Sequence, residues 1–528
     1  MERRRWGQRF LSIGLSFGLA ALAVVGLKPA FAADDDNQPV KKPLTEDQLL
    51  RKRINESLAG LRDPKAPQIQ TLKGPDLTDR EKVIHVLGRL GFGARPGEVD
   101  EVLKNGGWEA WVKLQMNPAK IDDASADRLV SQRYKFAKMS MAELQKEYDG
   151  DGQNIRELHK EFPEYIVARA TVSNRQFYEL MCDFWRNHFC VDMPQTNDLS
   201  RAWTDADYEN AVIRKNVFAH FGDMLMASAH HPAMLEYLDN KLSRANSWNE
   251  NYAREVMELH TLGADRGYGN LDVQELAKVL TGWAYDDSFQ FVYRPEWQQK
   301  GPKLWLGYRV NEGYDGGMFA LTTLAVHPNT AQFISEKLCR YLVNDNPPPG
   351  LVHKVASVFR QTQGDLPKVY MAIIGSREFM SRENYRCKFK TPLQFVVSAL
   401  RATNAKVDEP YKVTETLGKM GEPIYDCPDP TGYFDTAERW MDSGVLTARW
   451  QFAWDLARGD LSGVEVPDSF FEHYKADKPE EIEQKMIEDL IGGDAGDREL
   501  VALKDAANDK DIPKMTGIIL GSPSFQQR

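Results

Sequence analysis

Helical periodicity is the feature that most constrains how this chain folds. From Asp79 to the end, apolar residues recur every three or four positions in one segment after another, as in helices that bury one face. The predicted helices include residues 80–91, 141–148, 154–190, 479–491 and 498–508. One stretch breaks the rhythm: Phe289–Tyr293 and Lys303–Gly307 are short, aromatic-rich runs joined by a polar segment. The sequence therefore predicts a mostly α fold, a multi-helix globular body with a small β-hairpin near residues 289–309.

Residues 1–32 have the pattern of a secretory signal peptide. Arginines at the start precede an apolar stretch from Phe10 to Leu27, and Ala30-Phe31-Ala32 offers a small-residue cleavage site. A retained membrane helix is the alternative, because the apolar stretch is near the lower length limit for spanning a bilayer. Glycines within the stretch and three aspartates directly after it favour cleavage. We therefore expect an exported protein, periplasmic or extracellular, with no membrane span after cleavage.

The rest of the chain divides by composition. Residues 33–78 are polar and contain several prolines, which predicts a largely disordered leader. Residues 79–528 form the predicted helical domain, and the proline-rich segment 344–350 is a candidate sub-boundary within it. The formal net charge of −10 argues against a nucleic-acid partner, since proteins that bind nucleic acid usually present a basic face.

Five cysteines lie beyond the predicted signal peptide, at positions 182, 190, 339, 387 and 427. Their odd number leaves at least one thiol free even in an oxidising compartment. Cys182 and Cys190 are expected on one helix, where about 12 Å of rise separates them, too far for a disulfide. The chain has no CxxC pair, no CxxCH haem motif, no GxSxG elbow, no HExxH helix and no P-loop.

The densest polar block lies in the segment 249–262, which we predict to be helical. On such a helix Asn251, Glu255 and Glu258 share one face, with Arg254 at its edge and within reach of Glu258. Two adjacent carboxylates can share a proton, so that one acts as a general acid while the other stays ionised. An ion-pair face without catalytic activity is the alternative.

The histidines allow two interpretations. His260 falls on the opposite face of the same helix, where a core histidine with satisfied ring nitrogens is expected. His188 ends an apolar stripe, either as a buried structural residue or as a ligand or base beside Asn187 at a cavity. The pairs His230-His231 and His327-Pro328 indicate turns that start helices. A metal site built from His188, His230, His231, His327, Glu255 and Glu258 stays open, so both the metal and any cofactor are unknown.

Motifs in several parts of the chain resemble the bacterial family called domain of unknown function 1800. They include Phe184–Phe189, Pro232–Asn240, Asn249–Gly263, Leu280–Trp283 and Ser522–Phe525. The resemblance covers roughly residues 80–528, and it implies an exported, largely helical protein with no established activity. It also implies a partner, because such proteins often occur beside an exported sulfatase-like protein. Many relatives carry a histidine just before a Gly-x-Lys-x-x-Leu-Gly element, whereas residues 297–303 contain none, which puts any function of that histidine in doubt here.

Two functional hypotheses follow. The first is an exported pocket enzyme that cleaves an envelope or extracellular polymer by acid–base catalysis, with or without a metal, using Glu255, Glu258, Arg254, Asn251 and His188. The second is a non-catalytic binding or scaffold protein that works with an exported sulfatase-like partner. The substrate and the oligomeric state are left open by the sequence.

Overall fold

The structure, a computed structural model, describes residues 75–148, 152–192 and 202–528. The predicted signal peptide and residues 33–74 of the predicted leader lie outside the described residues. Within the described ranges, no helix combines the length and the apolar character that crossing a membrane requires.

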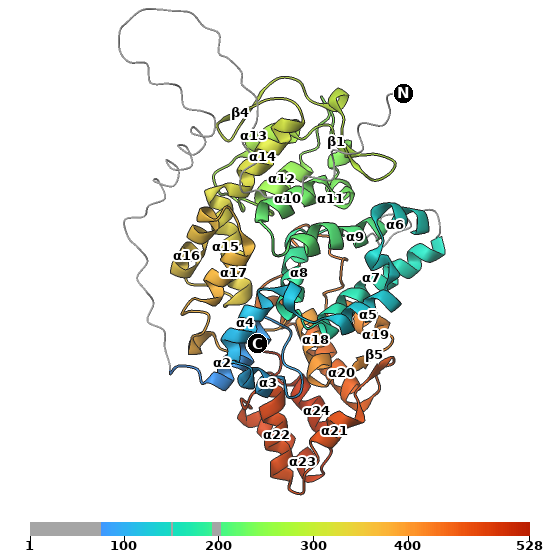
Figure 1. Ribbon diagram of the computed structural model, residues 1–528, viewed down its shortest axis with the longest axis vertical. Coiled ribbons are helices and arrows are strands. Elements are labelled where there is room, and N and C mark those ends of the chain that lie inside the picture. Colours follow the sequence, from blue (N-terminus) through green and yellow to red (C-terminus); the bar gives the residue numbers. More distant parts are fainter. Residues whose placement is uncertain (1–74, 149–151, 193–201) are drawn as a thin grey trace, which may run out of the picture. The chain divides into compact units, whose positions relative to one another are not determined.

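The described chain is mostly helical, as predicted (Figure 1). The helices up to residue 279 are α2 (Asp79–Arg89), α3 (Glu98–Lys104), α4 (Gly107–Gln115), α5 (Ala124–Arg133), α6 (Met141–Tyr148), α7 (Gly152–Val172), α8 (Gln176–His188), α9 (Ala202–Tyr208), α10 (Phe221–His230), α11 (Pro232–Tyr237), α12 (Asn251–Glu258) and α13 (Asn270–Val279). A π-helix, η4 (Glu209–Arg214), follows α9 directly.

The helices after residue 279 are α14 (Tyr314–Val326), α15 (Pro328–Leu342), α16 (Pro349–Gln361), α17 (Leu366–Ile374), α18 (Pro392–Ala402), α19 (Tyr411–Lys419), α20 (Ser443–Arg458), α21 (Asp468–His473), α22 (Pro479–Ile491), α23 (Asp497–Asn508) and α24 (Ile512–Gly521). Short 3₁₀ turns connect several of these elements: η1 (Pro118–Lys120), η2 (Lys135–Lys138), η5 (Asn240–Leu242), η6 (Pro295–Trp297), η7 (Arg382–Asn384) and η8 (Ala437–Trp440). Helices α15 and α16, on either side of the candidate sub-boundary at 344–350, pack against each other.

Small two-stranded antiparallel sheets make up the β structure of the described residues. Their strands are β1 (Trp283–Tyr285) with β2 (Phe291–Tyr293), β3 (Lys303–Trp305) with β4 (Tyr308–Val310), and β5 (Lys406–Val407) with β6 (Val464–Glu465). We had predicted that the two runs near 289–309 pair with each other, but they do not. The first run pairs with β1 and the second with β4. Leu306 and Gly307 both have positive φ, which allows the two-residue turn that joins β3 to β4.

A break between α7 and α8 replaces the single helix that the sequence predicted over residues 154–190. Asp123, which precedes α5, accepts hydrogen bonds from Ser173 Oγ at 2.8 Å and from the backbone N–H of Asn174 at 2.7 Å. These contacts stabilise the turn, because the carboxylate satisfies a backbone donor that a continuous helix would have paired internally. The break turns α8 back into the core.

Helix α8 lies near the middle of Figure 1, between α7 on one side and α15–α17 on the other. Its predicted apolar stripe is confirmed as buried: Phe177, Met181, Phe184, Trp185 and His188. The indole N–H of Trp185 donates to the hydroxyl of Tyr370 at 2.6 Å, so even the polar atom of this large side chain is satisfied. The helix is therefore fixed on its apolar side, and its opposite side faces the polar site described below.

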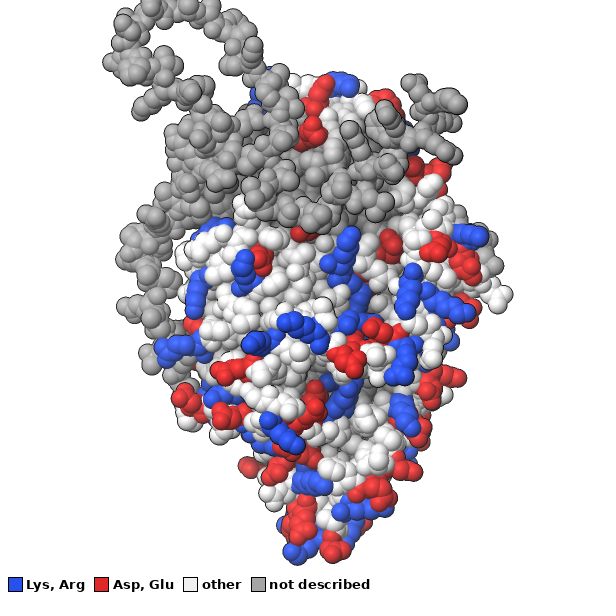
Figure 2. Space-filling view, in the orientation of Figure 1, with Lys and Arg blue, Asp and Glu red and all other residues white. Residues whose placement is uncertain are grey.

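Charges of both signs alternate over the part of the visible face that Figure 2 colours. Lysine and arginine side chains lie among aspartates and glutamates there, without a broad patch of either sign. The absence of a nucleic-acid partner remains a prediction from the net charge.

Candidate active site

A cavity of about 40 Å³ lies between α8, the start of α18 and the loop 421–435. A cavity needs roughly 10–15 Å³ to hold one water molecule, so this space can hold a few waters or one small polar group. Phe434, which lines the cavity, is 49% exposed. The polar and sulfur-bearing side chains around it are Asp183, Arg186, Asn187, Cys190, Tyr341, Thr391, Glu422, Tyr425, Cys427, Tyr433 and Asp435.

Two carboxyl groups, those of Asp183 and Glu422, face this cavity from different elements. Burial raises the pKa of Glu422, and the negative charge of Asp183 raises it further, to about 8, although Glu422 accepts a hydrogen bond from the backbone N–H of Leu393 at 2.7 Å. Burial also raises the pKa of Asp183. Two interacting carboxyl groups of this kind share one proton near neutral pH.

The hydrogen bonds assign that proton to Glu422. Asp183 receives a charged hydrogen bond from Arg186 at 3.2 Å and a second one from the hydroxyl of Tyr341 at 3.1 Å, and both favour its ionised form. These contacts favour a protonated Glu422 beside an ionised Asp183, which is the arrangement that general acid–base catalysis requires.

Arg186 connects the cavity to a buried glutamate. Its guanidinium forms two parallel hydrogen bonds with Glu209 of the π-helix η4, at 3.0 and 3.1 Å, and the hydroxyl of Tyr425 donates to the same carboxylate at 2.8 Å. Glu209 is fully buried. A bidentate pair of this kind holds the guanidinium plane in one orientation, so Arg186 presents a fixed positive charge to Asp183.

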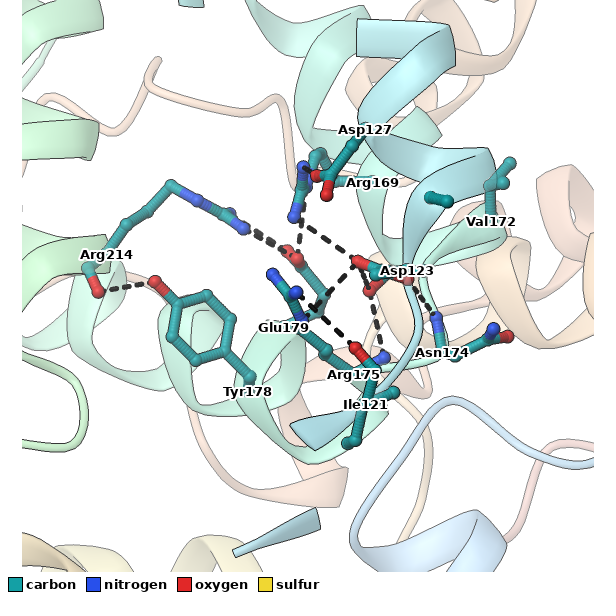
Figure 3. A network of polar contacts seen from close by, with 12 residues as sticks. Ile121, Asp123, Asp127, Arg169, Val172, Asn174, Arg175, Tyr178, Glu179 and Arg214 are labelled. Atoms are coloured by element: carbon teal, nitrogen blue, oxygen red, sulfur yellow. Dashed lines mark hydrogen bonds and ion pairs between the residues drawn. The ribbon is translucent and has the colours of Figure 1, made fainter. Parts of the chain in front are cut away.

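The ion pairs continue away from the cavity as a buried chain of alternating charge. Glu179, which lies one turn before Asp183 on α8, pairs with Arg169 at 3.1 Å and with Arg214 at 2.6 Å (Figure 3). Burial alone raises the pKa of Glu179, but the two arginines outweigh it and lower the pKa to about 2. The full order of the chain is Asp123, Arg169, Glu179, Arg214, Glu209, Arg186 and Asp183.

Asn187 attaches the loop 421–435 to α8. Its side-chain amide donates to the backbone oxygen of Tyr433 at 2.9 Å and accepts from the backbone N–H of Tyr433 at 2.6 Å. Gly432, with φ of 76°, lets the loop approach closely, because a Cβ atom there would meet the backbone and side-chain oxygens of Asn187. This contact holds the loop that carries Glu422 against the helix that carries Asp183.

Asn251, Arg254, Glu255 and Glu258 lie on α12, which ends earlier than expected, at Glu258, so that His260 lies beyond it. Glu255 and Glu258 are half-buried, and the side chain of neither forms a hydrogen bond or an ion pair with another described residue. Burial raises the pKa of Glu255, and the neighbouring charge of Glu258 raises it further. Neither side chain lines the cavity at α8.

The two remaining members of that block have other contacts. We had predicted that Arg254 lies within reach of Glu258, but it does not pair with that residue. It pairs with Glu250 at 3.2 Å and donates a hydrogen bond to Asn270 at 3.4 Å. The reason is direction, because Glu250 lies one turn back, where a helical side chain leans. Asn251 is the first residue of α12, and its backbone N–H donates to Asn249. The role of these residues in catalysis stays a prediction.

His188 and His260 lie in the core, side by side. Their ring centroids are 6.1 Å apart, and the Nε2 atom of His188 lies 3.2 Å from the backbone oxygen of His260. Burial lowers the pKa of His188 well below its usual range and that of His260 to about 3, so both rings are neutral. One nitrogen of each ring, His188 Nδ1 and His260 Nε2, lacks a hydrogen-bond partner among the described residues, which corrects the expectation that His260 is fully satisfied. Asn187 lines the cavity, whereas His188 does not.

Of the remaining candidate histidines, His231 and His327 start helices, as predicted, whereas His230 is the last residue of α10. The Nδ1 atoms of His231 and His327 accept hydrogen bonds from the backbone N–H of the second residue of α11 and α15, at 3.2 and 3.1 Å, and so act as N-caps. His230 stacks on Trp283 and contacts the hydroxyl of Tyr314. Within the described ranges, no three His, Cys, Asp or Glu side chains are close enough together to hold a metal ion.

Sequence reasoning missed Asp183 and Glu422. Glu179, Asp183 and Arg186 are spaced i, i+4, i+7, a charged stripe on a helix whose other face is aromatic, and this spacing is a readable signal. Glu422 offers no such signal, because it lies in a loop rich in proline that joins α8 only through tertiary contacts.

Comparisons with known proteins add a family and no activity. A family model described as "Protein of unknown function (DUF1800)" matches residues 85–527. No curated protein and no solved structure matches the chain.

Proposed function

The chain belongs to the DUF1800 family, whose function is unknown, and we propose from the geometry of its own cavity that it is an acid–base enzyme. In this proposal Glu422 is the general acid and Asp183 the general base in the hydrolysis of a polar linkage. The observation that carries the proposal is the buried carboxyl pair, with the pKa of Glu422 raised to about 8 beside Asp183, which accepts hydrogen bonds from Arg186 and Tyr341.

The reaction assigns one proton transfer to each group. Glu422 gives its proton to the leaving oxygen or nitrogen, while Asp183 takes a proton from the attacking water. Transfer of that proton back to Glu422 restores the starting state. The hydroxyl of Tyr341, which contacts Asp183, and the guanidinium of Arg186 orient the base throughout.

The size of the cavity limits how the substrate binds. A space of about 40 Å³ admits a water and the reacting group, while the rest of the substrate lies outside, next to the exposed ring of Phe434. This arrangement suits a polymer that presents one linkage at a time. Together with the predicted export, it supports an envelope or extracellular polymer as the substrate, in a periplasmic or secreted enzyme.

The test is fragment release from peptidoglycan and from a soluble bacterial exopolysaccharide by purified wild-type protein. We expect Glu422→Gln and Asp183→Asn to reduce the rate by about 10²–10⁴-fold, the usual contribution of a general acid or base. The matched control is Glu164→Gln, a change at a buried glutamate outside the cavity whose pKa is also raised by burial. Equal rates of fragment release by wild type and E422Q would contradict the proposal. So would the finding that wild type releases fragments from neither polymer.

The same assay separates this site from the pair predicted on α12. Loss of activity in Glu255→Gln, with E422Q unaffected, would move the catalytic carboxylates to Glu255 and Glu258. Loss in E422Q alone assigns them to the cavity.

A second candidate function rests on exposed apolar side chains of the segment 434–450. Phe434, Met441 and Trp450 are 49%, 49% and 51% exposed, and the ring of Trp450 stacks on that of Trp454. Exposed aromatic and methionine side chains are typical of protein interfaces, and they support the alternative of a binding protein with an exported sulfatase-like partner. Co-purification of that partner with wild type, lost in Trp450→Ser, is the expected result; retention in W450S contradicts this candidate.

A further inference from the structure

Two cysteine thiols meet at the edge of the cavity, from parts of the chain that are 237 residues apart. Cys190 lies two residues beyond the end of α8, and Cys427 lies in the loop 421–435. Both side chains line the cavity. The thiol of Cys190 lies 3.9 Å from the backbone oxygen of Cys427, and each of the two thiols shifts the pKa of the other.

We propose that Cys190 and Cys427 are a disulfide-forming pair whose oxidation fastens the loop 421–435 covalently to the end of α8. In the structure all five cysteines are free thiols, so it describes the reduced state of this pair. The proposal concerns the cysteines alone and rests on no part of the proposed catalysis.

The other three cysteines are in different surroundings. Cys182 and Cys339 are buried inside the helical core, and burial raises the pKa of both thiols. Cys387 is exposed and contacts Asn384 and the backbone of Val343. None of these three cysteines lines the cavity. The proposal therefore assigns one disulfide-forming pair and three free thiols.

The contact between the two thiols also divides their roles. A hydrogen bond from Cys190 lowers the pKa of Cys427, whereas that bond and burial raise the pKa of Cys190. Since the thiolate is the nucleophile in disulfide exchange, Cys427 attacks first and Cys190 resolves.

The chemistry needs an oxidant of the disulfide class. The Cys427 thiolate attacks one sulfur of the oxidant, whose S–S bond breaks, and one oxidant thiolate leaves with the electron pair. Cys190 then loses its proton and attacks Cys427 Sγ, which breaks the mixed disulfide and releases the second thiolate. Overall, two protein thiols are oxidised, the oxidant disulfide is reduced by two electrons, and the two protons pass to the released thiolates.

Oxidation would add a covalent link to the existing attachment of the loop. The hydrogen bonds between Asn187 and Tyr433 already hold the loop six residues beyond Cys427. Glu422 lies five residues before Cys427, so the disulfide fixes the segment that carries it. A link that closes so long a stretch of chain restricts the unfolded state strongly.

The test is peptide mapping of the full chain after equilibration with oxidised glutathione, followed by unfolding and alkylation with iodoacetamide without reductant. We expect the peptides with Cys190 and Cys427 to be joined, and Cys182, Cys339 and Cys387 to be alkylated. The joined peptide should persist in Cys387→Ser and vanish in Cys190→Ser and Cys427→Ser. Alkylation of both Cys190 and Cys427 in wild type, or a link from either one to another cysteine, overturns the proposal.

A thermal measurement gives an independent readout. Dithiothreitol should lower the unfolding midpoint of the oxidised wild type and leave that of C427S unchanged. Equal midpoints of oxidised and reduced wild type would show that no link is formed. Neither peptide mapping nor thermal unfolding measures polymer cleavage. The disulfide proposal can therefore fail while the acid–base proposal stands, and the reverse.

Discussion

The side chain of Asn187 and the backbone of Tyr433 are joined by two hydrogen bonds, at 2.9 and 2.6 Å, in the manner of paired strands. This one contact brings the loop with Glu422 against the helix with Asp183, 239 positions earlier in the chain. The carboxyl pair of the candidate site therefore depends on an asparagine that takes no part in the chemistry.

Replacement of Asn187 by Ala should destabilise the protein by about 2 kcal/mol, because both hydrogen bonds are lost and the partly buried backbone of Tyr433 is left unpaired. Urea unfolding measures the change. The matched control is Asn117→Ala, which removes one exposed hydrogen bond to Lys113 and should change stability by less than about 0.5 kcal/mol. Equal stability of the two variants would contradict the assigned contact.

Gly432 tests the close approach of the same loop. Both Gly432 and Gly421 have positive φ, so alanine strains either position by about 1 kcal/mol. Only at Gly432 does the added Cβ also meet oxygens of Asn187, whereas nothing lies within 4 Å at Gly421. Gly432→Ala should therefore be clearly less stable than Gly421→Ala in urea, and the reverse order would show that the loop does not pack as described.

Much of the helical framework could be predicted from the sequence, and the breaks in it could not. The periodic runs that became α2, α6, α22 and α23 were predicted within two residues, because local spacing decides which face is buried. The separation of α7 from α8 was not predicted, because it depends on Asp123, some 50 residues away.

The candidate site shows the same limit. The carboxylates on α12 could be selected from the sequence because they are neighbours on one helix, and the structure places both on that face with the pKa of Glu255 raised. Glu422 becomes visible only when the fold brings it to Asp183, since desolvation and a distant charge are tertiary properties.

Glu179 tests the buried chain of ion pairs. Glu179→Gln leaves Arg169 and Arg214 without their shared anion and should destabilise the protein by about 3 kcal/mol or more at neutral pH. The control Glu250→Gln removes a half-exposed pair with Arg254 and should cost less than about 1 kcal/mol. Urea unfolding at neutral pH ranks the two variants, and equal losses would contradict the network.

The same variant has a defined pH dependence. Because the pKa of Glu179 is lowered from 4.5 to about 2, its contribution to stability is complete above pH 4.5 and is lost as the pH falls toward 2. The difference between wild type and E179Q should therefore shrink in this range. A difference that stays constant down to pH 2 would show that Glu179 is not held as an anion.

Glu422 should affect stability in the opposite direction. Its pKa is raised from 4.5 to about 8, so the folded state holds the proton more tightly than the unfolded state does. Wild type should consequently lose unfolding free energy as the pH rises from 4.5 to 8, whereas Glu422→Gln lacks this loss. Parallel pH profiles of the two proteins in urea unfolding would contradict the assignment.

The most direct measurement of the central claim is the titration of Glu422 itself, by ¹³C NMR of protein labelled at the glutamate side-chain carboxyl carbon. We expect one carboxyl signal to titrate with an apparent pKa of about 8, to be absent from E422Q, and to move to lower pH in Asp183→Asn, which removes the neighbouring charge. If every glutamate signal of the wild type titrates below pH 6, the cavity holds no protonated acid at neutral pH and the acid–base account is wrong.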